Sequence, residues 1–126
     1  MVRIEADVGR NRLLLIISGR PDPERSEAAW AALDGALSRL RAPVDVLSDI
    51  RGLEVLDPQL LEDFKRFGER LRQFGVRRVV RIVGKSAQAA VQVERLTRHL
   101  KGHAAHLAFS EADAEQVFSK TFSPPR

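Results

Sequence analysis

The chain has 126 residues, and 21 basic residues against 17 acidic ones give it a net charge of +4. This length fits one compact domain, and a hydrophobic fraction of 44% excludes a mainly disordered chain. The absence of cysteine excludes disulfide frameworks, cysteine-ligated metal centres and thiol nucleophiles. No apolar run has the length of a membrane-spanning helix and no signal-peptide core opens the sequence, so we expect a cytoplasmic microbial protein.

The first part of the chain predicts a hairpin followed by a helix. Apolar and charged residues alternate over 2–8, a turn follows at 9–11, and 12–18 is an almost wholly apolar strand. Asp22 and Pro23 are typical of a helix start, and Pro43 ends the helix. Its predicted inner face, with Trp30 beside it, comprises Ala29, Leu33, Ala36, Leu37 and Leu40.

The rest of the chain alternates strands and helices. Strands are predicted at 44–50, 76–83 and 104–109. Asp57 and Pro58 open a long amphipathic helix that Gly75 ends, Ser86 caps a third helix, and Ser110 with Glu111 starts a short last one. The inner face of the long helix comprises Leu60, Leu61, Phe64, Phe67, Leu71 and Phe74.

This order, β-β-α-β-α-β-α-β-α, predicts an α/β fold. Helices of crossover length between strands imply a mixed, mostly parallel sheet with helices packed on it. We find no internal repeat and no linker, so we expect a single domain over 1–119 and a flexible C-terminal tail over 120–126.

Histidines and a phosphate-loop fragment are weak signals for chemistry. His99 and His103 have the spacing of two metal ligands on a helix, but Gly102 lies between them and no glutamate accompanies them. With His106 they are more typical of a helix end, so no metal or other cofactor is expected. Lys85 and Ser86 follow Gly84 as in a P-loop, but Val79 stands where that motif needs glycine. A helix cap with weak anion binding is the better interpretation.

Two further candidates, Asp49 and Asp57, lie at the predicted carboxyl edge of the sheet, where α/β folds usually bind ligands, and a third, Arg81, lies within a predicted strand. Asp49 and Asp57 are interpreted mainly as turn and capping residues, with an acid/base pair as the alternative. Arg81 interrupts an apolar strand, so it faces a solvated sheet surface, pairs with an acid such as Asp49, or binds a ligand anion. Elsewhere acids and bases are interleaved, and the phenylalanines lie on an apolar helix face, so no nucleic-acid partner is expected.

The segment from Leu47 to Leu60 contains a strand ending in Asp49, a turn, and Asp57 at a helix start. With the order of elements it resembles the STAS domain (sulfate transporter and anti-sigma-factor antagonist), in particular the stand-alone bacterial STAS/SEC14-like branch. Asp49 and Asp57 match the aspartates of the family pattern. Its Asp-Ser-Ser-Gly motif carries a serine that a partner kinase phosphorylates in the antagonists. Pro58 and Gln59 stand there in this chain, so phosphorylation at that place is chemically impossible.

The resemblance implies a non-enzymatic regulatory module that docks a protein partner, or a second copy of itself, at the start of the long helix. The expected contacts are Asp57, Pro58, Gln59, Leu60, Asp63 and Lys65. One alternative is a lipid or small apolar ligand, which needs a cavity near Phe64, Phe67, Leu71 and Val91. The other is an enzyme that uses Asp49 and Arg81. The weaker anion or ligand candidates are Asp49, Arg81, Lys85 and Ser86.

Overall fold

The computed structural model describes residues 2–19, 26–53, 58–83 and 105–121, which form strands and helices in the predicted alternation. The elements in chain order are β1 (Val2–Asp7), β2 (Arg12–Gly19), α1 (Ser26–Leu37), β3 (Val44–Leu53), α2 (Pro58–Phe74), β4 (Val76–Ile82), β5 (Ala105–Ala108) and α4 (Glu111–Thr121). The third predicted helix, together with Asp22, Pro23, Lys85 and Ser86, lies outside the described residues.

The strands form one five-stranded mixed sheet in the order β1-β2-β3-β4-β5. β1 and β2 pair antiparallel, and every later pair is parallel, as the hairpin and the crossover helices predict. Asn11 turns the hairpin with a positive φ of 50°, and its side chain hydrogen-bonds the backbone of Arg41 and Pro43. These bonds attach the turn to the loop that leads into β3.

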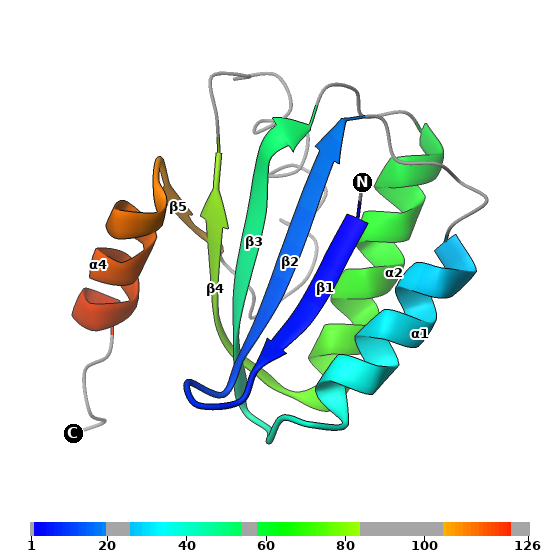
Figure 1. Cartoon of the computed structure of the whole chain (residues 1–126), viewed down its shortest axis with the longest axis horizontal. Coiled ribbons are helices and arrows are strands. Elements are labelled where there is room, and N and C mark those ends of the chain that lie inside the picture. Colours follow the sequence, from blue (N-terminus) through cyan, green and yellow to red (C-terminus); the bar gives the residue numbers. More distant parts are fainter. Residues whose placement is uncertain (1, 20–25, 54–57, 84–104, 122–126) are drawn as a thin grey trace.

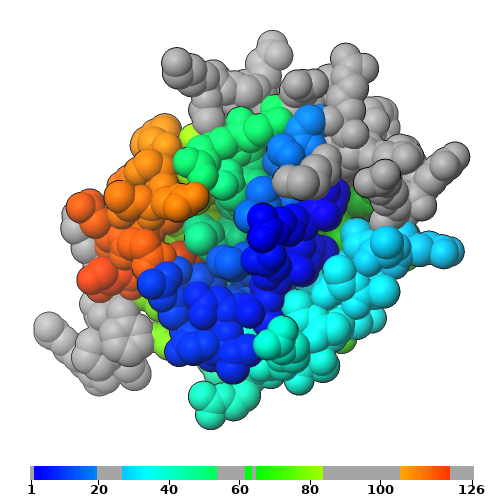
Figure 2. Space-filling view, viewed as in Figure 1, coloured from blue at the N-terminus to red at the C-terminus, as the bar shows by residue number. Residues whose placement is uncertain are grey.

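Helices cover both faces of the sheet (Figure 1). α1 and α2 pack on one face around fully buried Leu13, Leu33 and Val46. α4 packs on the other face, where Ala114 and Phe118 contact a cluster that includes Val80. α4 covers the β4 and β5 side of that face, and the space-filling view shows it beside the blue β1–β2 hairpin (Figure 2).

The predicted start and end of α2 and the predicted start of α4 are confirmed, but the prediction that Pro43 ends the first helix is wrong, because α1 ends at Leu37. α2 runs from Pro58 to Phe74, and Gly75 follows it with a φ of 109°, which favours glycine. Ser110 caps α4, because its hydroxyl oxygen accepts a hydrogen bond from the Asp113 amide at 3.0 Å. α4 extends to Thr121, however, two residues into the predicted tail. Among the described residues, no helix is long and apolar enough to cross a membrane.

Candidate interaction surface

An open groove of about 330 Å³ lies between α1 and α2 on the outside of the molecule. One residue of α1 and six residues of α2 line it: Trp30, Glu62, Lys65, Arg66, Glu69, Arg70 and Gln73. The lining positions of α2 recur at helical spacing, so α2 presents one face to the groove, and α1 contributes Trp30. We refer to this surface as the α1–α2 groove.

Trp30 gives the groove an aromatic platform. Its indole is half-buried and stacks on the buried ring of Phe67, with ring centroids 4.6 Å apart and an interplanar angle of 20°. The guanidinium carbon of Arg66 lies over the same indole, 5.0 Å from the centroid. Because Phe67 belongs to the core cluster beneath, the indole is held by the core and keeps part of its surface open to solvent.

Some charges around the groove are already paired within the protein and others are not. The Nε atom of Arg70 lies 3.1 Å from Oδ1 of Asp34 on α1, and Arg72 lies 3.1 Å from Glu69. Glu62, Lys65 and Arg66, in contrast, form no ion pair within the described part of the chain. Among the described residues, two cations and one carboxylate of the groove are therefore not engaged by an ion pair.

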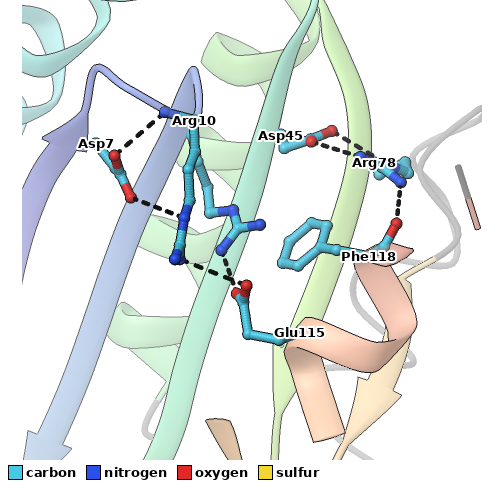
Figure 3. Close-up of polar contacts among 7 residues, drawn as sticks. Asp7, Arg10, Asp45, Arg78, Glu115 and Phe118 are labelled. Atoms are coloured by element: carbon cyan, nitrogen blue, oxygen red, sulfur yellow. Dashed lines mark hydrogen bonds and ion pairs between the residues drawn. The ribbon is translucent and has the colours of Figure 1, made fainter. Parts of the chain in front are cut away.

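A second charged cluster lies under α4, at the start of the parallel strands (Figure 3). Arg78 binds both carboxylate oxygens of Asp45, at 2.7 and 3.1 Å, and donates from Nη1 to the Phe118 carbonyl at 2.6 Å. Arg12 pairs with Glu115 of α4, and its guanidinium lies 3.9 Å from the centroid of the Phe118 ring. These contacts attach α4 to the sheet.

Asp49 faces the same side of the sheet as this cluster, but nearer the other end of the strands. Burial raises the pKa of Asp49, while the side-chain and backbone hydrogen bonds and the charge of Arg51 lower it, so that the net pKa falls below its usual value. Arg51 holds the carboxylate with two bonds, of 3.0 and 2.7 Å, and also reaches Glu111 at 3.1 Å. Those contacts raise the pKa of Arg51, first through Asp49. Asp49 is thus an ionised carboxylate engaged by its neighbour.

The structure does not bring Asp49 and Arg81 together. In the β3–β4 register Arg81 is the partner of Ser48, and Asp49 is the partner of Ile82. Since successive strand residues point to opposite faces, Arg81 lies on the α1–α2 side and Asp49 on the α4 side. Arg81 is also only 5% exposed, so the prediction of a solvated surface for it is wrong. β3 continues to Leu53, so Asp49 is not at the strand end as predicted.

The residues predicted to contact a partner differ in their exposure. Lys65 is exposed and lines the groove, whereas Asp63 is only 9% exposed in α2 and offers little surface to a partner. Pro58, Gln59 and Leu60 form the first turn of α2, but their side chains are outside the described ones, and so is Asp57 entirely.

The structure describes only some of the residues that were predicted to surround a cavity for an apolar ligand. Phe67 and Leu71, 7% and 8% exposed, belong to the core cluster under α1 and α2 and do not line the groove. The Phe64 side chain and Val91 lie outside what the structure describes. His106 is exposed on β5, and the described residues contain no group of three potential ligands that could hold a metal ion.

Sequence reasoning missed Trp30, Arg66 and Arg70 as surface residues of interest. A signal was present, since Arg66 and Arg70 are one helical turn apart and Trp30 lies beside, not within, the predicted inner face of its helix. The packing of α1 against α2, which brings Trp30 into one groove with both arginines, cannot be inferred from the sequence.

No protein-family model matches the chain, and no curated protein matches it.

Proposed function

We propose that this protein is a non-enzymatic, STAS-like regulatory module that binds a protein partner through the α1–α2 groove. One observation carries the proposal: Trp30 forms a half-buried platform, stacked on Phe67, in an open groove where Glu62, Lys65 and Arg66 form no ion pair with any described residue. Tryptophan and arginine are the residues that most often dominate binding energy at protein interfaces. A side chain already held by the core also loses little conformational entropy on binding.

The regulatory part of the proposal rests on binding without phosphorylation. Pro58 and Gln59 have no hydroxyl to accept phosphate, so partner binding at α2 cannot be controlled by a phosphate at those positions. α2 remains the docking helix, as the resemblance implies, but the surface that supports docking lies further along it, from Glu62 to Gln73.

The two alternative functions have less support from the described residues. An enzyme that uses Asp49 and Arg81 needs both side chains at one substrate, and they occupy opposite faces of the sheet. A lipid site needs a cavity among apolar side chains, and Phe67 and Leu71 are packed in the core. The groove, by comparison, has a mostly charged lining.

The chain has no cysteine, so one introduced cysteine is a unique attachment point for a photo-crosslinker. Lys65→Cys places the label in the groove, and Arg41→Cys, at an exposed residue of the loop before β3, is the matched control. We expect discrete crosslinked products in native lysate, or a crosslinked dimer of the purified protein, from position 65 alone. No product from position 65, or the same products from both positions, would overturn the proposal.

A further inference from the structure

We infer that the partner presents a carboxylate-rich peptide segment to the α1–α2 groove, with an apolar side chain seated against Trp30. This inference rests on the proposed function and specifies the chemistry of the partner. It follows from which charges in the groove are free and which are already paired.

The charge of the groove favours an acidic partner. Its lining contains three cations and two carboxylates. Glu69 is engaged by Arg72, which neutralises one carboxylate inside the protein. Arg70 is engaged by Asp34, but that carboxylate is 60% exposed and the pair is open to exchange with a carboxylate of a partner. Lys65 and Arg66 thus outnumber Glu62 among the charges that have no ion-pair partner within the described chain.

The aromatic platform favours a peptide over a purely charged ligand. The indole of Trp30 is half-buried and lies under the guanidinium of Arg66, so the part of the indole that remains open to solvent is an apolar surface next to a cation. A segment that places an apolar side chain on the indole brings its flanking carboxylates to the cations on the rim, where arginine matches carboxylate geometry well. A groove of about 330 Å³ accommodates one or two such side chains, with the remaining contacts on the flanking helices.

The carboxylates in the groove disfavour a nucleic-acid strand. A phosphodiester backbone carries one negative charge per nucleotide and needs a continuous track of cations. Glu62 and Glu69 separate the cations along α2, although Arg72 already pairs with Glu69. A peptide can avoid them by placing its acids only where Lys65, Arg66 and Arg70 lie.

The protein reports on this groove by its own fluorescence, because Trp30 is the only tryptophan and the chain has no tyrosine. The probe is a short capped peptide with two central leucines flanked by glutamates. Versions with glutamine or lysine in place of every glutamate, and a single-stranded oligonucleotide, serve as comparisons. We expect the acidic peptide to change Trp30 emission saturably, with an affinity that falls as salt rises. The glutamine version should bind about tenfold more weakly and the lysine version should not bind.

Variants locate the binding on the proposed cations. Lys65→Ala and Arg66→Gln are each expected to weaken the acidic peptide about fivefold, the size typical of an exposed ion pair. Arg41→Gln is the matched control, since Arg41 is an exposed cation of the loop before β3 that does not line the groove. Equal losses from all three variants, equal binding of the lysine peptide, or tighter binding of the oligonucleotide would overturn the inference. If position 65 still crosslinks a partner while the acidic peptide fails to bind, only this inference fails and the proposed function stands.

Discussion

Two arginine–aspartate pairs in this molecule have the same chemistry and opposite surroundings. Arg78 and Asp45 lie under α4, and their side chains are 13% and 9% exposed. Arg70 and Asp34 join α2 to α1 at the rim of the groove, and their side chains are 37% and 60% exposed. The first pair is bidentate and has a third contact to a backbone carbonyl, whereas the second is a single contact at 3.1 Å.

The difference indicates which charges hold the fold and which are available for binding. A buried charge must be fully paired, because removing one partner leaves the other desolvated. An exposed pair contributes little to stability, since water and salt replace each partner easily. We therefore assign the cluster under α4 to the attachment of that helix and the charges of the α1–α2 groove to recognition.

The largest expected effect is on the buried pair. Asp45→Ala leaves the guanidinium of Arg78 without its bidentate partner under α4, and should lower the free energy of unfolding by about 3–5 kcal/mol. Denaturant unfolding followed by circular dichroism measures the loss. Glu5→Ala, which removes the exposed partner of Arg3, is the control and should cost less than about 1 kcal/mol. Equal losses in the two variants would show that burial does not distinguish these pairs.

The fold was largely predictable because its signals are local. Alternation over 2–8 is the period of a half-exposed strand, and proline and glycine mark both ends of α2. Hairpin and crossover lengths then require an antiparallel first pair and parallel later pairs, which the sheet has.

The candidate site was less predictable because it depends on register and on distant contacts. Whether Asp49 and Arg81 share a face depends on a one-residue difference in the alignment of β3 with β4, which neither strand encodes by itself. Arg12 and Glu115 are 103 positions apart, so nothing local marks them as partners. Trp30 was predicted beside an apolar face, but its role depends on how α1 docks on α2.

A smaller, pH-dependent effect on stability is expected for the Asp49–Arg51 pair, which is more exposed than Arg78–Asp45 and less exposed than Arg70–Asp34. The folded pKa of Asp49 is lowered, so its ionised form contributes stability above the unfolded pKa of about 3.9, and this contribution is lost as pH falls through the folded value. In the Arg51→Gln variant, the burial of Asp49 is no longer opposed by a neighbouring cation, so the pKa of Asp49 rises. We expect the acid-unfolding midpoint to move to higher pH, with a loss at neutral pH below about 1 kcal/mol because Arg51 is 37% exposed.

An acid titration followed by circular dichroism tests this shift. Arg3→Gln, which removes the partner of exposed Glu5, is the matched control and should leave the midpoint close to that of the parent. A midpoint for Arg51→Gln that stays at the parent value would mean that Asp49 is not stabilised by Arg51.

The smallest expected effect is at the rim of the α1–α2 groove. Arg70→Gln removes the ion pair with Asp34, and the free energy of unfolding should change by no more than about 0.5 kcal/mol, because both groups are readily solvated. Leu37→Ala, at a residue of α1 that is 1% exposed, sets the scale in the same denaturant experiment with a loss of about 2–5 kcal/mol.

A loss from Arg70→Gln as large as that from Leu37→Ala would mean that an ionic contact holds α1 on α2. The charges of the groove would then have a structural role, and the contrast between the two pairs would disappear. If Arg70→Gln leaves stability unchanged, apolar packing alone attaches α1, and the rim charges are available for a partner without cost to the fold.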